Sequence, residues 1–426
     1  MGKTQRKSAS AAPKRHKKIQ DAQQAALDAL KPSKKHLEHG LALHKELVVV
    51  ESYGFAPYCA PDADAVNRAM DAGATDAELE TMMNEMRVAR CAWDPREREE
   101  FQAAWAASGM TAIFQNAGGG AGLSSLSTLA HYCHVIDNMP DFLVRATTPE
   151  EILAAKKAGK QAMLFSSNSV PLAGEGSSPE NECRHMRTFF NLGYREAHLA
   201  YNRGNLLADG CVEPRNGGLT DFGRKAVAAL NDAGIILDVA HTGWRSSYEA
   251  AKASRLPIVA SHTSCCGLFE HFRGKPDDVV KAIAEGGGLV GVVWVPAFLG
   301  GSLDMNAMLD HVDYLAKLVG VDHIGMGSDI TYQTSLRRQE ITKIKQRRRL
   351  RLGLSQFWPA DANKGDPSWN MAREDSLAWV NRPYATVGLV QRGYADEDIA
   401  KIVGGNHLRV FQDVLDGRKK MAGEEA

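Results

Sequence analysis

Residues 238–263 read Asp-Val-Ala-His-Thr-Gly-Trp-Arg-Ser-Ser-Tyr-Glu-Ala-Ala-Lys-Ala-Ser-Arg-Leu-Pro-Ile-Val-Ala-Ser-His-Thr, and this stretch decides the fold. Two short apolar runs, 235–239 and 257–260, have the length and β-branching of buried strands. The residues between them have helical composition, and a histidine follows each run, at His241 and His262. In a βα-barrel the carboxyl ends of successive strands open on one face. Two imidazoles delivered to that face can bind one metal ion.

The alternative is that these are two unrelated histidines at strand ends. For an arbitrary pair that interpretation is the better one. Here the repetition of a strand followed by a histidine in two neighbouring units favours a shared metal site.

The same alternation of apolar runs and helical segments extends over most of the chain. Apolar runs begin near residues 47, 111, 161, 196, 235, 257, 289 and 323. About eight strands that alternate with helices predict an α/β fold, a (β/α)8 TIM-like barrel. The polar residues just beyond these runs then form one candidate rim: Glu51, Tyr53, Gln115, Asn168, Tyr201, His241, His262 and Asp329.

The barrel does not account for the ends of the chain. Residues 1–18 are basic and polar, and we expect a disordered tail there. Residues 19–46 predict an N-terminal helical extension, residues 47–415 the barrel with its C-terminal helices, and residues 416–426 a flexible tail. A basic arm could bind nucleic acid, but a solvated tail is the better interpretation of so short a charged segment.

Composition limits the partners and the cellular compartment that we expect for the chain. The 426 residues carry a formal net charge of zero, so no overall field favours nucleic acid or a membrane surface. The chain contains no apolar run of the roughly 18 residues that a membrane span needs, and its first residues lack the apolar core of a secretory signal. The seven scattered cysteines suit a reducing compartment. We therefore expect a cytoplasmic protein without nucleic-acid or membrane partners.

Five motifs resemble one known family. They are Asp238-Val-Ala-His241, Ser261-His262-Thr263, His271-Phe-Arg273, Gly327-Ser328-Asp329 and Gly404-Gly405-Asn406-His-Leu-Arg409. Together, in this order, they are similar to the membrane (renal) dipeptidase family of the metal-dependent amidohydrolase superfamily, over roughly residues 47–415. The segment 199–223 looks like a bacterial branch of that family.

The resemblance implies roles for individual residues. His241 and His262 match the pair that holds the second zinc, and Arg273 matches the arginine that receives the substrate carboxylate. Asp329 matches the final-strand aspartate that contacts the substrate amine and handles the proton. Tyr201 stands where many members have a histidine that steadies the oxyanion, and we assign its neighbour Asn202 to substrate binding. The resemblance also implies a small-molecule substrate and a homodimer.

The chain departs from the family pattern at the first metal. Members usually carry His-x-Asp after the first strand, where this chain has Tyr53 and Phe55. The bridging glutamate falls near Asn168, with Glu175 a few residues on as a displaced substitute. We therefore predict an atypical centre with one zinc or other divalent ion. Its third ligand would come from Glu51, Tyr53, Glu175, Asp329, substrate or water.

These observations predict a metal-dependent hydrolase of the dipeptidase type, acting on a small carboxylate-bearing amide or dipeptide-like compound. One alternative is a barrel enzyme with non-peptidase chemistry, a lyase, isomerase or other hydrolase, on a small acidic metabolite. Another is a catalytically silent paralogue that binds a ligand. The cationic segment 337–351 is either a solvated helix or oligomer contact, or a lid that attracts anionic substrates.

Overall fold

Eight parallel strands form a nearly closed barrel in the computed structural model, which confirms the predicted (β/α)8 class. The structure describes residues 16–119, 122–176, 178–346, 373 and 375–423. In barrel order the strands are β1 (Val50–Gly54), β2 (Ala112–Asn116), β4 (Gln161–Ser167), β5 (Tyr194–His198), β6 (Ile236–Asp238), β7 (Val259–Cys265), β9 (Leu289–Val292) and β10 (Ile324–Met326).

Backbone hydrogen bonds just beyond the last strand bring the two ends of the sheet together. The Asp329 amide donates to the Tyr53 carbonyl at 3.2 Å, and the Phe55 amide donates to the Ile330 carbonyl at 3.3 Å. Segments that follow β1 and β10 therefore lie side by side at the carboxyl end of the barrel, where active sites of this fold are built.

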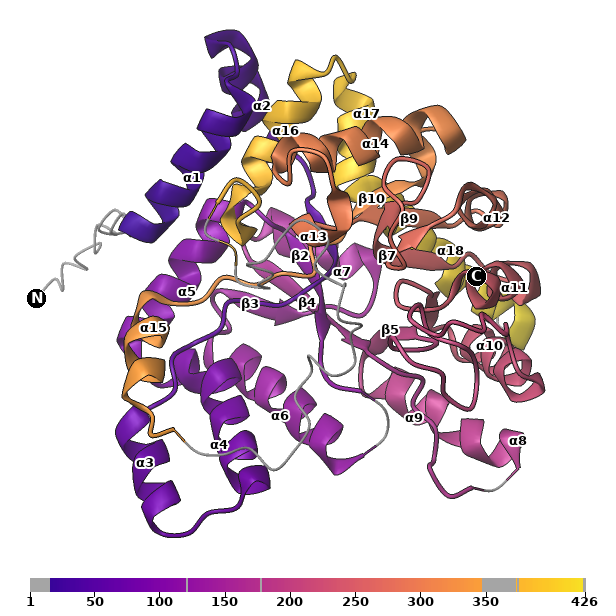
Figure 1. The fold of residues 1–426 in the computed structure, drawn as a ribbon, viewed down its shortest axis with the longest axis horizontal. Coiled ribbons are helices and arrows are strands. Elements are labelled where there is room, and N and C mark those ends of the chain that lie inside the picture. Colours follow the sequence, from indigo (N-terminus) through magenta and orange to yellow (C-terminus); the bar gives the residue numbers. More distant parts are fainter. Residues whose placement is uncertain (1–15, 120–121, 177, 347–372, 374, 424–426) are drawn as a thin grey trace, which may run out of the picture.

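Helices surround the sheet (Figure 1). They are α1 (Lys17–Leu30), α2 (Lys34–Glu46), α3 (Ala63–Asp71), α4 (Asp76–Ala89), α5 (Pro95–Ser108), α6 (Leu123–Asn138), α7 (Pro149–Lys157), α8 (Pro179–Glu182), α9 (Met186–Asn191), α10 (Asp221–Ala233), α11 (Trp244–Ala253), α12 (Asp277–Glu285), α13 (Pro296–Leu299), α14 (Met305–Val319), α15 (Ser335–Lys343), α16 (Arg382–Gln391), α17 (Asp396–Ala400) and α18 (Asn406–Ala422).

Two short strands, β3 (Leu143–Arg145) and β8 (Gly274–Lys275), have no counterpart among the predicted strands. β3 pairs with β4, and β8 pairs with β7. A run of two residues is too short to show a strand period in the sequence. β8 can therefore be recognised only from its hydrogen bonds to β7. Its pairing is nevertheless important, because it holds the segment that contains Arg273 against β7.

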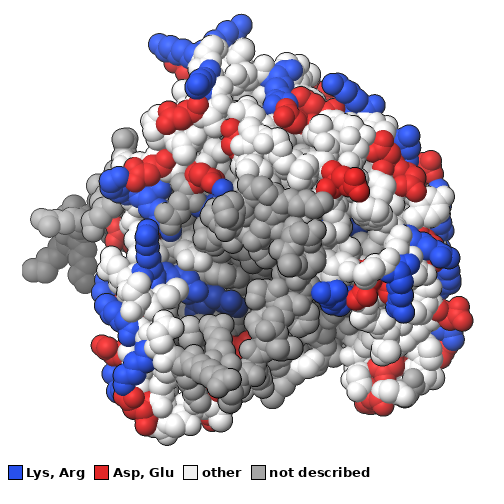
Figure 2. Space-filling model, viewed as in Figure 1, with Lys and Arg blue, Asp and Glu red and all other residues white. Residues whose placement is uncertain are grey.

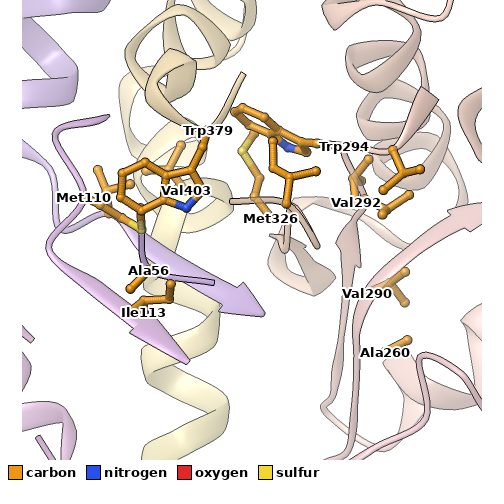
Figure 3. Close-up of a cluster of buried hydrophobic side chains, with 14 of the residues drawn as sticks. Ala56, Met110, Ile113, Ala260, Val290, Val292, Trp294, Met326, Trp379 and Val403 are labelled. Carbon is orange, nitrogen blue, oxygen red and sulfur yellow. The ribbon is translucent and has the colours of Figure 1, made fainter. Parts of the chain in front are cut away.

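The core is the apolar interior between barrel and helices. In Figure 3 the indole rings of Trp294 and Trp379 lie among aliphatic side chains from β2, β9 and β10. Trp379 also packs edge-on against Trp105 of α5, with ring centroids 5.4 Å apart. The predicted apolar run of β9 is buried along its whole length, as expected of a strand covered on both faces.

The described residues nearest to both chain ends are helical. Residues 1–15 lie outside the described residues, but α1 already begins at Lys17, and its Ile19, Ala22 and Ala26 are buried. At the other end, where we expect a flexible tail from residue 416, α18 continues to Ala422. The reason is packing that residue composition does not reveal, because the Arg418 guanidinium lies over the Phe190 ring, 5.4 Å from its centroid.

His44 of the helical extension gives a testable link between burial and pH. Its Nε2 lies 3.0 Å from the Ser108 carbonyl and its Nδ1 2.7 Å from the Thr386 hydroxyl, so the neutral ring is satisfied on both sides. Burial lowers the pKa of His44 to about 4. As the pH is lowered, the unfolded chain therefore takes up a proton near pH 6.5, before the native state does. The free energy of unfolding decreases as the pH decreases.

Between pH 7 and pH 5 this difference should cost about 2 kcal/mol of unfolding free energy. His44→Gln should reduce the difference in unfolding free energy between pH 7 and pH 5 by that amount, as measured by urea unfolding at both pH values. His36→Gln, on the same helix at a less buried position, is the control and should leave the slope as it is. An unchanged slope in His44→Gln would contradict the assignment.

The described surface carries charges of both signs. On the face shown in Figure 2, Lys and Arg side chains alternate with Asp and Glu side chains. No helix within the described ranges is long and apolar enough to cross a bilayer. All seven cysteines are described, and none of them forms a disulfide.

Candidate metal centre and active site

The structure brings three of the predicted residues together at the carboxyl end of the barrel. His241 follows β6, His262 lies within β7, and Asp329 follows β10. The Nε2 atoms of His241 and His262 are 3.0 Å apart, and Asp329 Oδ2 lies 4.0 Å from His262 Nε2. Ligand atoms of all three side chains lie within 4.8 Å of one another, a separation that lets them hold one ion.

Hydrogen bonds behind His241 fix which ring nitrogen carries its proton. His241 Nδ1 lies 2.7 Å from Asn202 Oδ1, and the Cys211 thiol approaches the same oxygen at 3.5 Å. An amide oxygen only accepts, so Nδ1 of His241 donates to it. The lone pair of His241 Nε2 is therefore directed at His262.

His262 is held in the same tautomer by a different chain of partners. The Ser261 hydroxyl donates to Asp238 Oδ2, so its oxygen accepts from His262 Nδ1 at 2.7 Å. The His262 Nε2 lone pair then faces that of His241 across 3.0 Å. Two lone pairs at this distance repel each other unless a cation lies between them, and outer partners of this kind are typical of ligating histidines.

The electrostatic environment keeps both rings neutral. Burial, followed by the nearby Arg273 guanidinium, lowers the pKa of His241 and of His262 well below the ordinary histidine value. Burial also raises the pKa of Asp329 to about 6. Neutral imidazoles and a carboxylate are the donors that zinc prefers in proteins, so this set fits a divalent ion.

Two residues of the site adopt left-handed backbone conformations. Asp329 has φ 58° and Asn202 has φ 57°. Asp and Asn tolerate this region better than most residues, but each position still costs roughly 1–3 kcal/mol. Such strain persists where the surroundings impose it, and here both residues adjoin the paired histidines.

Tyrosine rings cover both imidazoles. Tyr201, beyond β5, stacks on His241 with centroids 4.3 Å apart, and Tyr53 of β1 stacks on His262 at 4.1 Å. Burial raises the pKa of the Tyr201 phenol, so the hydroxyl stays protonated and remains a donor. The predicted catalytic tyrosine therefore lies against a predicted metal ligand.

Arg273 is fully buried beside the two histidines. Its guanidinium donates to the Ala240 carbonyl and, at 3.0 Å, to the His262 carbonyl, and it lies over the Phe298 ring. It makes no ion pair with any carboxylate of the described residues, and its Nε has no hydrogen-bond partner. A buried cation without an anion is costly, so the site is suited to an anionic group.

The remaining candidates occupy different places. Asn202, expected on the substrate, is fully buried and contacts His241 Nδ1 through its side chain. Glu51 is bonded to the Ser328 backbone amide and paired with Arg382 in the interior. Glu175 pairs with Arg184 and is 55% exposed, so Asp329 is the candidate third ligand that the structure places beside both histidines.

Tyr53 and Asn168, which stand where the family resemblance implies ligands of the first metal, are hydrogen-bonded to each other. The Tyr53 hydroxyl donates to Asn168 Oδ1 at 2.5 Å and accepts from Asn116 Nδ2 at 2.6 Å. A phenol and two amides offer no carboxylate or imidazole, and burial raises the pKa of Tyr53 further from ionisation. These residues do not fit the family's first zinc.

Sequence reasoning overlooked His198 and the ligand potential of Asp238. His198 ends β5 and is 1% exposed, with Nε2 2.7 Å from Asp238 Oδ2. Its ring centroid lies 5.4 Å from those of both His241 and His262. The available signal was the alternation of polar Glu196 and His198 within β5, which places both on one face of the strand.

The cationic segment is anchored where it is described. Arg337 donates to the Cys59 carbonyl at 3.0 Å, and its guanidinium lies 5.9 Å from the Tyr58 ring centroid. Residues 347–351 of the predicted lid lie outside the described residues. The lid interpretation thus stays a prediction.

Comparison with known proteins identifies the family to which the chain belongs. A family model described as membrane dipeptidase (peptidase family M19) matches residues 41–350. The chain is 25% identical over 287 residues to the dipeptidase tcpJ of Claviceps purpurea and 27% identical over 288 residues to the dipeptidase aclJ of Aspergillus oryzae. Each match covers 66% of this chain but only 58% of the relative's length.

Solved structures share the fold. An amidohydrolase from Pseudomonas aeruginosa aligns with TM-score 0.64 at 24% identity, over 88% of this chain and 98% of that one. A metallopeptidase from Rhodobacter sphaeroides, liganded with a phosphinate mimic of the dipeptide L-Ala-D-Ala, aligns with TM-score 0.59 at 16% identity, over 86% and 99%. By the match of its sequence to the family model, this chain belongs to the membrane dipeptidase family, peptidase family M19.

Proposed function

We propose that the chain is a metal-dependent hydrolase of the dipeptidase type, acting on a small amide or dipeptide-like compound with a free carboxylate. The observation that carries this proposal is the convergence of two neutral imidazole lone pairs, 3.0 Å apart, with Asp329 beside them. Relatives named as dipeptidases support the reaction class.

The ligand types favour a single divalent ion, with zinc as the preferred metal, held by His241, His262 and Asp329. When bound, the ion would polarise the scissile carbonyl and make water more acidic. Asn202 and Ser261 orient the two rings through Nδ1. The tyrosine–amide network around Tyr53 leaves no ligands for the family's other ion.

The chain's own groups would divide the remaining work. The buried Asp329 carboxylate would take the proton from the attacking water and return it to the departing amine. The protonated Tyr201 hydroxyl would donate a hydrogen bond to the developing oxyanion. Arg273 would bind the substrate carboxylate with the N–H groups that its backbone partners do not use.

Arg273→Gln should separate carboxylate recognition from catalysis. A lost charge-assisted contact of about 2–3 kcal/mol corresponds to a roughly 30–200-fold rise in KM. The wild type should prefer a free dipeptide over its C-terminally amidated form, and the variant should lose that preference. The matched control is Arg245→Gln on α11, an exposed arginine paired with Glu249, which should behave as the wild type.

Circular dichroism is needed alongside, because Arg273 also bonds two backbone carbonyls. A folded Arg273→Gln variant that still discriminates between the two substrates would contradict the assignment.

A panel of dipeptides and lactams tests the reaction class. Hydrolysis of at least one free dipeptide that depends on added zinc supports the dipeptidase proposal. The loss of the first-metal ligands favours a second candidate, a non-peptidase barrel enzyme acting on a small acidic metabolite. Zinc binding without hydrolysis of any panel member would direct attention to that candidate.

A further inference from the structure

A third imidazole adjoins the proposed metal centre and takes no part in the proposed hydrolysis. His198, at the end of β5, contacts the Tyr53 ring with centroids 5.0 Å apart. Register places His198 opposite Asp238 on the neighbouring strand β6. These strands thus direct a histidine and a carboxylate to one place within the barrel wall.

The hydrogen bonding of His198 is incomplete. Neither of its ring nitrogens has a hydrogen-bond partner, although the ring is 1% exposed. Nε2 approaches Asp238 Oδ2 to 2.7 Å but without the alignment of a hydrogen bond. A buried polar atom left unpaired costs roughly 1–3 kcal/mol. An imidazole nitrogen and a carboxylate oxygen this close together can both serve as ligands of one cation.

The donor chemistry suits a cation. Ligand atoms of His198, Asp238 and His262 all lie within 4.8 Å of one another, and all three side chains are buried. The Ala240 amide donates to Asp238 Oδ1 at 2.8 Å, and the Ser261 amide donates to the same oxygen at 3.1 Å. Oδ2 accepts from the Ser261 hydroxyl and also faces His198. Outer hydrogen bonds of this kind orient ligating carboxylates.

The pair also has the composition of the ligands that the chain lacks. The family resemblance implies a histidine and an aspartate after the first strand, where this chain has Tyr53 and Phe55. His198 and Asp238 provide one imidazole and one carboxylate from β5 and β6 instead. Tyr53 contacts the rings of both His198 and His262. The His198–Asp238 pair therefore lies next to the position of the missing first-strand ligands.

We propose that His198, Asp238 and His262 form a second ligand set for the divalent ion, alternative to His241, His262 and Asp329. The inference rests on the proposed function only in requiring that the chain binds such an ion. His262 belongs to both sets, so one ion can use either set but not both in full. The ion would therefore have two neighbouring positions, with His262 common to them.

Calorimetric titration of the metal-depleted full chain with zinc tests the second position. His241→Ala weakens the first set and should still bind about one zinc, because the second set is intact. Adding His198→Gln to that variant should weaken zinc binding at least roughly tenfold further. His407→Gln in the same background is the control, because His407 is also buried in the barrel but bonds Ser52. It should leave zinc affinity unchanged.

Asp329→Asn is a second background, in which no side chain is shortened, unlike His241→Ala. Adding His198→Gln to Asp329→Asn should cause the same further loss of zinc affinity. Equal zinc affinity with and without His198 in both backgrounds would overturn the inference, as would a folded His241→Ala variant that binds no zinc. Neither result touches the proposed function. A wild type that binds no zinc would overturn both.

Discussion

Replacing His262 with alanine should abolish metal binding and hydrolysis together. His262 Nε2 faces His241 Nε2 at 3.0 Å and Asp329 Oδ2 at 4.0 Å, so it is the central member of the ligand set. Its loss leaves one imidazole and one carboxylate in each of the two proposed ligand sets, too few to hold an ion tightly. We expect kcat/KM to fall by at least about 10³-fold, which corresponds to roughly 4 kcal/mol of transition-state stabilisation.

The measurement pairs elemental analysis with kinetics on the same preparations. The control is His311→Ala, because His311 is equally buried and bonds the Cys265 amide of the same strand, β7, at 3.1 Å. That variant should lose stability and keep its metal. A folded His262→Ala variant with full metal content would show that the ion lies elsewhere.

Asp329→Asn should remove proton transfer while preserving shape. The amide is isosteric with the carboxylate but cannot accept a proton from water, so the loss should appear in kcat. General acid–base groups contribute roughly 10²–10⁴-fold, and we expect a decrease in that range with little change in KM.

The matched control for Asp329→Asn is Asp322→Asn, an exposed aspartate near β10 that pairs with Lys401. Steady-state kinetics with saturating zinc separates the effect from weaker metal binding. A fall in kcat/KM that comes entirely from a rise in KM would assign Asp329 to substrate binding alone.

The fold could be predicted because strand and helix periods are local properties. Apolar runs such as that of β9 are long enough to be recognised, and each of the two histidine-bearing runs is followed by its histidine. Parallel strands in a barrel then bring these residues to one face without further information. For this reason His241, His262 and Asp329 could be placed together in advance.

The unpredicted parts depend on contacts between distant segments. Glu51 follows a strand signal and was assigned to the rim, yet Arg382 of α16 pairs with it in the interior. His198 was overlooked because the rim was set at Tyr201, and only the register between β5 and β6 brings His198 opposite Asp238. The structure places Asn202 behind His241, where its Oδ1 lies 2.7 Å from His241 Nδ1.

Elemental analysis of protein purified without chelator tests the central claim most directly. The account predicts about one equivalent of a divalent metal, zinc first, in the wild type. It predicts none in the protein that combines His241→Ala with His262→Ala. Wild-type protein that is folded but carries no stoichiometric metal, and binds none when zinc is supplied, would contradict it.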